Sequence, residues 1–259
     1  MGAEICNDAI DNDGDGRADC ADPDCSGVGQ CPVCGSVENP MATPLALPDG
    51  LNSGAMCSTD VQCVGTMTPT GTPTPNCVAK ECHASYNNTL HFIGFPQNAT
   101  LTDPTKLLSV CVTIEHSWMR DLQMDLITPP DVGGTRHVVT LHAFVSRSGA
   151  EEYLGNANDS DSDANPVPGV GAEYCWTPAA AQTMMQGPTM PAPNGFADEL
   201  VPGNYKSISP WGTFNGVTLN GDWTMRVTDL WQIDNGYMFK WSIKFDPSLV
   251  SDCSGPIIL

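Results

Sequence analysis

The chain has 259 residues, of which 30 are acidic and 10 are basic, so its formal net charge is −20. This charge excludes binding to the phosphate rows of nucleic acids or to anionic membrane surfaces, and the absence of an apolar run of about 18 residues excludes a membrane span. With 15% charged residues, 25 glycines and 22 prolines, the chain is rich in turns and poor in long amphipathic helices, which predicts an all-β fold.

The first predicted element is an acidic loop of twelve residues, from Asp11 to Asp22. Calcium prefers about six to eight hard oxygen ligands, and a tight coil returns alternate side chains to one point. Gly16 at the sixth position permits the sharp turn, and the Arg17 carbonyl supplies a ligand at the seventh. Carboxylates stand at positions 1, 3, 5, 9 and 12, which are Asp11, Asp13, Asp15, Asp19 and Asp22. The spacing therefore predicts a calcium site.

The alternative for this segment is a disordered acidic tail. Residues 1–24 hold eight acidic residues and one basic residue, so they repel one another when no cation is present. A tail would need neither Gly16 nor the cysteines around the loop, Cys6, Cys20 and Cys25, which favours the calcium site. Because no amphipathic helices flank the loop, we do not expect an opening sensor of the EF-hand type.

The cysteines indicate the compartment. The chain has twelve, nine of them before residue 83. Disulfides are favoured over zinc thiolates, because an acidic, lysine-poor chain suits an extracellular life. The pair Cys31-Pro-Val-Cys34 lacks the strand-to-helix context of a redox motif and is interpreted as structural. We therefore predict a secreted or cell-surface protein with most of its cysteines in disulfides.

The composition predicts two parts. Residues 1–34 form a Cys-rich acidic calcium-loop segment, and residues 35–259 form a β-sandwich. Within the second part, the Thr-, Pro- and Gly-rich run from residue 66 to 76 cannot bury a core and is expected to be a loop. Four cysteines surround this run, namely Cys57, Cys63, Cys77 and Cys82. We therefore expect a disulfide-stapled insertion at about 51–85.

From about residue 86 onward, apolar and polar residues alternate as in half-buried strands. Residues 108–114 and 122–126 have this pattern, as do residues 237–245. The last strand is expected to place five side chains on one face, Tyr237, Phe239, Trp241, Ile243 and Phe245. Turn signals such as Asn220-Gly221 separate the strands, which predicts an antiparallel sandwich with one helix-like piece at 178–185.

Two resemblances to known families follow from these motifs. The stretch from Glu4 to Cys25 resembles the Asp-rich, cysteine-flanked metal motif of secreted bacterial proteins and the thrombospondin type 3 repeat. The run Val110-Cys-Val-Thr-Ile-Glu-His-Ser-Trp-Met-Arg-Asp-Leu-Gln-Met-Asp-Leu-Ile-Thr-Pro129 resembles a segment of the proprotein convertase P domain. The blocks Gly221-Asp-Trp-Thr-Met-Arg-Val-Thr-Asp229, Asp234-Asn-Gly236 and Trp241-Ser-Ile243 are similar to the closing motif of that family, in the expected order.

The P-domain resemblance implies a jelly-roll-like antiparallel β-sandwich that accompanies subtilisin-like proteases and recurs in secreted bacterial proteins. Leu47-Pro48-Asp49-Gly50 resembles the opening of the family, which makes residues 51–85 an insertion in the first loop. The chain departs from the family at Arg120, where glycine is usual. It departs again at Tyr174-Cys175-Trp176, which implies a disulfide role for Cys175. Cys111 and Cys253 are the other late cysteines, and one of them is expected to pair with Cys175 or with the N-terminal set.

The sandwich holds further candidate metal ligands. Asp121, Asp229 and Asp234 are expected at strand ends, where they form a second calcium site or accept backbone N–H groups. Another triplet, Asp159, Asp161 and Asp163, repeats the start of a calcium loop, but Ala164 at the sixth position favours a solvated polar loop. His116 is interpreted as a packed structural histidine, because no activating partner is visible.

No catalytic motif is present, since the sequence lacks His-Glu-x-x-His, Gly-x-Ser-x-Gly and a subtilisin-like serine block. We therefore expect a non-enzymatic, secreted calcium-binding module with a structural or adhesive role. A cell-surface protein, a glycan or copies of the chain itself are the expected partners. Two alternatives stay open. One is the accessory P domain of a secreted protease separated from its catalytic domain, and the other is a carbohydrate-binding module, which rests on fold analogy.

Overall fold

The structure is a computed structural model that describes residues 3–26, 28, 31, 36–47, 74–78, 81–93, 95–144, 149–158, 167–230 and 234–250, with residues 36–43, 74–78 and 81–86 described by their backbone. In this part of the chain, strands alternate with short 3-10 turns and there is no α-helix, which confirms the predicted all-β class. None of the described residues forms a helix long and apolar enough to cross a bilayer.

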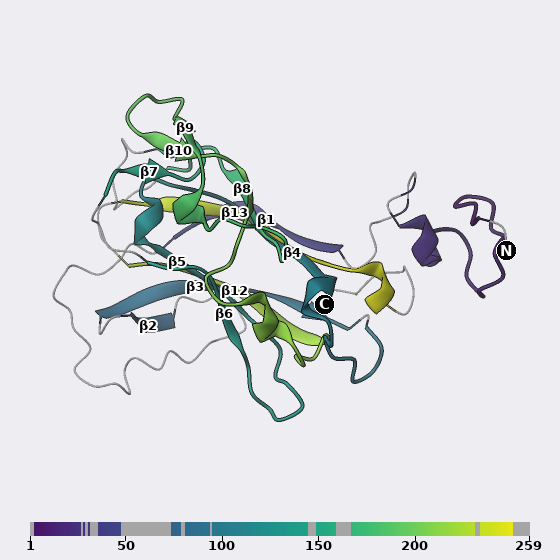
Figure 1. The fold of residues 1–259 in the computed structure, drawn as a ribbon. Coiled ribbons are helices and arrows are strands. Elements are labelled where there is room, and N and C mark those ends of the chain that lie inside the picture. The colour runs from purple at the N-terminus through teal and green to yellow at the C-terminus, as the bar shows by residue number, and fades with distance from the viewer. Residues whose placement is uncertain are drawn as a thin grey trace.

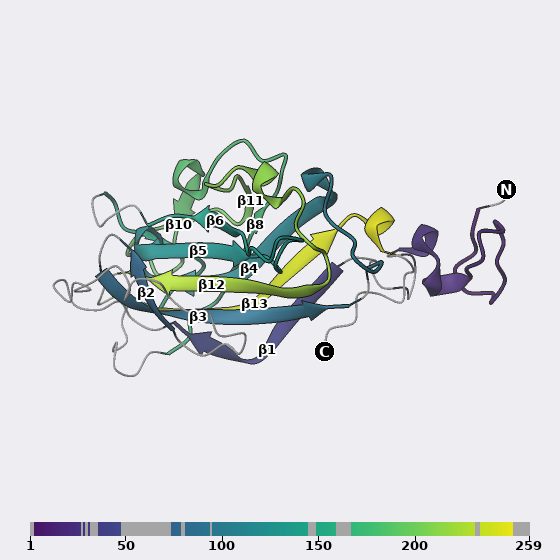
Figure 2. The ribbon, with the colours of Figure 1, turned by 90° about the horizontal axis from the view of Figure 1, so that it is seen from below.

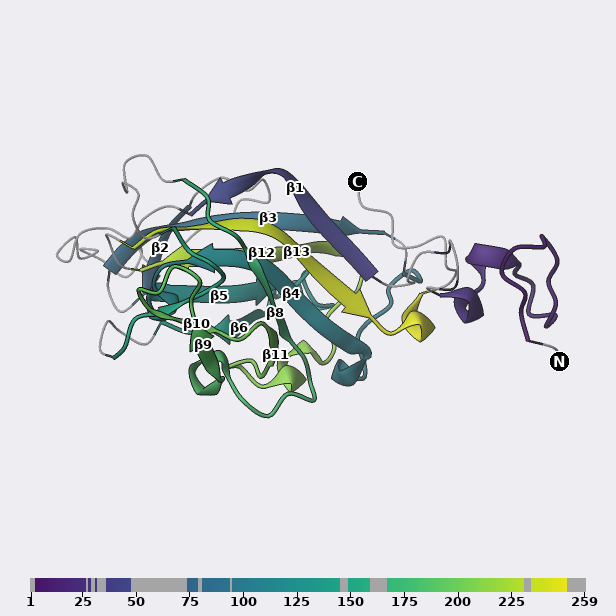
Figure 3. The same ribbon diagram turned by 90° about the horizontal axis from the view of Figure 1, so that it is seen from above.

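Two five-stranded sheets stack face to face as a β-sandwich (Figure 1). The first sheet has, in order, β1 (Ser36–Ala46), β13 (Gly236–Phe245), β4 (Leu107–His116), β8 (Ala172–Trp176) and β11 (Gly203–Tyr205). The second has β2 (Thr74–Val78), β3 (Glu81–Phe92), β12 (Gly221–Asp229), β5 (Leu122–Ile127) and β6 (Val138–His142). Figure 2 shows the second sheet from below, and Figure 3 shows the first from above.

All neighbouring strands in these two sheets are antiparallel except β8 and β11, which are parallel. A smaller sheet has the order β7 (Glu152–Tyr153), β10 (Asp198–Leu200) and β9 (Thr189–Pro191). The long antiparallel pairings β4–β13 and β5–β12 lie at the centre of the two large sheets, one in each. They bring residues 107–127 beside residues 224–229 and 236–245.

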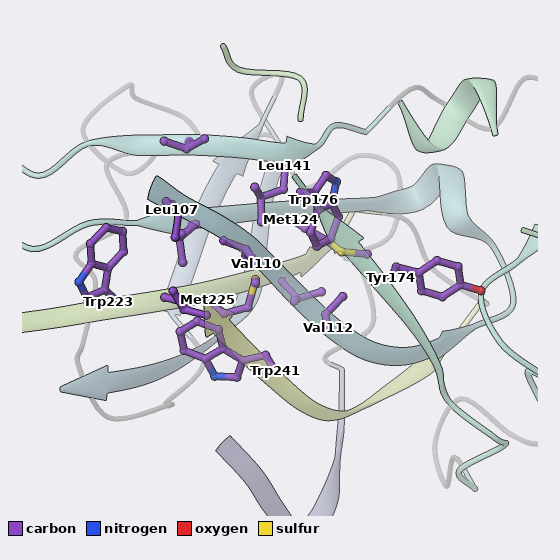
Figure 4. Packing of buried hydrophobic residues seen from close by; sticks show 14 of the residues in the cluster. Leu107, Val110, Val112, Met124, Leu141, Tyr174, Trp176, Trp223, Met225 and Trp241 are labelled. Carbon is purple, nitrogen blue, oxygen red and sulfur yellow. The ribbon is translucent and has the colours of Figure 1, made fainter. Parts of the chain in front are cut away.

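Alternating side chains from both large sheets fill the space between them (Figure 4). On β12, Trp223, Met225 and Val227 are fully buried. Arg226 lies between them on the opposite face, where its guanidinium is 2.7 Å from the Asp125 carboxylate of β5. This period of two is the one that the sequence pattern predicts for a strand with one face in the core.

Aromatic rings close one region of the core. Phe245 meets Phe92, Phe95 and Trp223 in edge-to-face contacts, with ring centroids 5.8, 5.0 and 5.5 Å away. Such contacts stabilise aromatic clusters beyond the area they bury. The predicted inward position of Phe245 at the end of β13 is therefore confirmed.

β13 departs from the predicted alternation at one point. Its pairing with β4 shifts register between Met238 and Lys240, and a β-bulge of this kind turns the following side chains over. As a result Met238 is fully buried in the core, whereas Phe239 is only half-buried and does not belong to it. The expectation that Phe239 shares the inner face with Trp241 is wrong, because the bulge adds a residue between them.

The region of the predicted insertion contributes to the second sheet. β2 and the start of β3 form a hairpin in which Cys77 is the direct partner of Cys82, so strand structure begins at Thr74. Residues 48–73, which include Gly50, Cys57 and Cys63, lie outside the described residues. Of the helix-like piece expected at 178–185, the structure has a single 3-10 turn at Met184–Gln186.

Candidate metal centres

The acidic N-terminal segment is held together by two disulfides. Cys6 is bonded to Cys25, on either side of the predicted loop, and Cys20 near the end of the loop is bonded to Cys31. Two 3-10 turns, Asp19–Ala21 and Pro23–Cys25, contain Cys20 and Cys25. Figure 1 shows this segment (purple) beside the sandwich rather than within it. The described residues of this segment form no apolar core of their own, so the segment depends on these bridges and on the hydrogen bonds of its carboxylates.

A series of carboxylate-to-backbone hydrogen bonds coils the loop. The Asp11 oxygens accept the N–H groups of Gly14 at 2.7 Å and Gly16 at 2.9 Å. Asp13 accepts the N–H of Asp15 at 3.1 Å, and Asp15 in turn accepts that of Arg17 at 2.9 Å. Gly16 has a φ of +97°, in the region that favours glycine. The turn predicted at the sixth position is present.

Asp19 faces a different part of the segment. Its carboxylate accepts the backbone N–H groups of Asp8 and Ala9, with contacts of 2.8–3.1 Å. Glu4 has a similar role, since its two oxygens accept the N–H groups of Asn12 and Asp19 at 2.8 and 3.2 Å. Both side chains therefore tie the start of the chain to the loop. The Arg17 guanidinium lies 3.4 Å from the Asp15 carboxylate.

Two sets of carboxylates have oxygen atoms within 4.8 Å of one another, Glu4 with Asp11 and Asp13, and Asp13 with Asp22 and Asp24. Two oxygens bound to one calcium at about 2.3–2.6 Å lie at most about 5 Å apart, so both sets fit this ion. Three of the predicted ligands are in these sets, whereas Asp15 and Asp19 are in neither. Glu4 and Asp24 were missed by the sequence pattern. Asp24 has the alternate spacing from Asp22 that could have revealed it, but nothing in the sequence marks Glu4.

Asp22 has the most unusual environment of these carboxylates. It is 1% exposed, and its Oδ1 accepts the N–H of Asp24 at 2.7 Å. Its Oδ2 is buried and has no hydrogen-bond partner among the described residues. A buried anionic oxygen without a donor is costly. A cation at this oxygen would remove the cost, so the donor set of hard carboxylate oxygens fits calcium.

The three candidate ligands of the sandwich gather at one end of it. Asp121 precedes β5, Asp229 ends β12 and Asp234 precedes β13, and the side chains of all three are buried. Backbone hydrogen bonds join these loops, including one of 3.0 Å from the Leu230 N–H to the Asp121 carbonyl. Among the described residues, however, the ligand sets within 4.8 Å fall in the N-terminal segment. The structure thus places these three carboxylates at the same end of the sandwich, but they do not form one of these ligand sets.

His116 lies in the middle of this group and is fully buried. Its Nδ1 accepts the N–H of Trp118 at 3.0 Å, so in the neutral ring Nε2 carries the proton and donates to Asp229 at 3.3 Å. Burial lowers the pKa of His116, although the carboxylates of Glu115, Asp121 and Asp234 oppose the shift. This is the packed histidine that the sequence favours. The candidates Asp159, Asp161 and Asp163 lie outside the described residues.

A third disulfide lies in the sandwich. Cys111 on β4 and Cys175 on β8 are direct cross-strand partners and are bonded to each other, which answers the question of the partner of Cys175. All cysteines with described side chains are in disulfides, as predicted. Cys253 lies outside the described residues.

Two more buried groups have shifted pKa values. His142 on β6 is 1% exposed, and its Nε2 donates to the Met119 carbonyl at 3.0 Å. Burial, together with the nearby Arg120 charge, lowers the pKa of His142 to about 4. Glu199 on β10 is 5% exposed, and burial raises the pKa of its carboxyl.

Comparison with known proteins assigns no family to this site or fold. No protein-family model matches the chain, and neither a curated protein nor a solved structure matches it.

Proposed function

We propose that this chain is a secreted, non-catalytic structural or binding module, in which the acidic N-terminal segment binds calcium and the sandwich is of the P-domain kind. The observation that carries the proposal is the buried Asp22 carboxylate, whose Oδ2 has no donor in the described part of the chain. It lies beside Asp13 and Asp24 in a disulfide-braced loop. A cell-surface protein, a glycan or a second copy of the chain is the proposed partner.

The disulfides support an extracellular location. Three bridges are present among the described residues, and two of them stabilise a segment of only about thirty residues whose described part has no apolar core. Small segments of this kind depend on cross-links in oxidising compartments. The net charge of −20 suits a protein that collects divalent cations.

The strand arrangement supports the P-domain part of the proposal. The run from residue 110 to 129 folds into β4 and β5, and the blocks at 221–229 and 234–243 fold into β12 and β13. β4 pairs with β13 and β5 pairs with β12. The motifs that carry the resemblance therefore become the central neighbours of both sheets, and their Asp121, Asp229 and Asp234 meet at one end.

The environment of the histidines supports a non-catalytic role. His116 and Asp229 form a hydrogen-bonded pair of the type that activates nucleophiles, but they are 0% and 1% exposed. A general base must come within hydrogen-bond reach of its substrate. The burial of this pair therefore favours a structural function for it.

Calcium titration of the full chain, with amide exchange as a second measurement, tests the proposal. In the empty loop the carboxylates repel one another, so binding energy becomes local folding energy. We expect a dissociation constant of about 10⁻⁴–10⁻³ M, as in extracellular modules. Calcium should slow exchange in residues 4–25 and leave residues 221–229 unchanged. Absence of both binding and protection, at calcium concentrations well above about 10⁻³ M, would overturn the proposal.

A further inference from the structure

We propose that the cation is held by Asp13, Asp22 and Asp24, and that Asp19 is a structural residue outside the ligand set. This inference rests on the proposed calcium function. It assigns a ligand set that differs from the one predicted by the twelve-residue spacing. In that spacing, Asp19 is a ligand and Asp24 lies beyond the loop.

The two carboxylate sets differ in how many of their oxygens already accept hydrogen bonds. In the set of Glu4, Asp11 and Asp13, both oxygens of Glu4 and both oxygens of Asp11 already accept backbone N–H groups. In the other set, the buried Oδ2 of Asp22 accepts none in the described residues. A divalent cation is attracted most to the site where an anionic oxygen has no other compensation.

The local fold explains how Asp24 reaches this site. Asp22 caps the 3-10 turn Pro23–Cys25 by accepting the Asp24 N–H, which keeps the two residues adjacent. Cys25 is fully buried and bonded to Cys6, and this bridge fixes the end of the turn. The two carboxylates are thereby held within 4.8 Å of an oxygen of Asp13.

Asp19 is engaged elsewhere. Its carboxylate accepts N–H groups from both Asp8 and Ala9. Its backbone has a φ of +53°, which lies in the left-handed region. A cation bound to Asp19 would compete with these two N–H groups for the same carboxylate oxygens. Asp19 therefore connects residues 8–9 to the loop.

Calcium titrations of the full chain and of two charge-matched variants test the inference. Asp24→Asn and Asp19→Asn each remove one negative charge from the same segment, so the general Coulombic loss of about twofold is common to both. We expect Asp24→Asn to weaken calcium binding by about tenfold or more, since affinity follows the number of ligand charges. Asp19→Asn should change it by less than about threefold, the part due to general charge. Non-reducing peptide mapping should find the Cys6–Cys25 and Cys20–Cys31 bridges in both variants.

The wild-type chain supplies a second measurement that requires no variant. Asp24 and Asp15 are both exposed and differ in that only Asp24 belongs to a ligand set. Carbodiimide labelling of carboxylates should decrease at Asp24 when calcium is added and stay constant at Asp15. If Asp19→Asn weakens binding as much as Asp24→Asn, or if calcium fails to protect Asp24, the ligand assignment is wrong while calcium binding stands. If the wild-type chain binds no calcium, the proposed function fails as well.

Discussion

Lowering the pH should destabilise the sandwich through the buried imidazole of His142. In the folded protein its pKa is about 4 instead of the usual 6.5. Between these two values the unfolded chain binds a proton that the folded chain does not, so stability falls as the pH falls below 6.5. A difference of about 2.5 pH units, at about 1.36 kcal/mol per unit, corresponds to about 3.4 kcal/mol. About 2 kcal/mol of this should be lost by pH 5.

Urea unfolding at pH 7 and pH 5, for the wild type and for His142→Gln, measures this effect. Glutamine keeps a side-chain N–H for the Met119 carbonyl and does not titrate. The comparison cancels the contributions of His116 and of the carboxylates, because both proteins share them. We expect the wild type to lose about 2 kcal/mol more than the variant between the two pH values. Equal losses, or a His142 ring that NMR shows to be protonated at pH 5, would refute the reasoning.

Three other predictions follow from buried groups and cross-links. Glu199→Gln should stabilise the protein at pH 7, because burial raises the carboxyl pKa and disfavours its charge; the gain in thermal stability should disappear below the usual pKa of about 4.5. Trp176→Phe should lower the free energy of unfolding in urea by at least about 1 kcal/mol less than Trp223→Phe does. The reason is that the Trp223 indole N–H donates to a backbone carbonyl, whereas the Trp176 indole N–H has no acceptor among the described residues. Equal costs would contradict this. The double variant Cys6→Ser/Cys25→Ser should bind calcium at least about tenfold more weakly while the sandwich keeps its far-UV spectrum; unchanged affinity would show that the bridge does not position the site.

The sequence pattern predicts the strands that place one face in the apolar core and fails where backbone detail decides. β5 and β12 follow their alternation, and so does β4 from Val110 to Ile114, because packing between two sheets requires a period of two. The alternation expected from residue 108 is wrong at its start, because Leu107 rather than Leu108 lies in the core where the pairing with β13 shifts register. β1 was not expected, since Pro40 and Pro44 interrupt its pattern. It is one of the two edge strands of its sheet, where proline is tolerated because fewer N–H groups are paired. The bulge at Phe239 has no sequence signal.

In the acidic segment, the spacing rule identifies the loop and its turn at Gly16. It cannot show which carboxylates accept hydrogen bonds from backbone N–H groups. Asp19 accepts N–H groups from residues ten and eleven positions earlier in the chain. Glu4 reaches Asn12 and Asp19 across a similar distance. Such contacts depend on how the disulfides fold the segment back on itself, which the spacing within a single loop does not contain.

The bridge between Cys111 and Cys175 has a mechanical consequence for the sandwich. It joins directly opposed residues of two paired strands, and these residues are 64 positions apart in the sequence. When the chain is pulled from its ends, this enclosed length carries no load while the bridge is intact. At about 3.3–3.6 Å per residue, the bridge withholds roughly 200 Å of extension. A single-molecule pulling experiment would record this as a shorter contour length, which would increase on reduction.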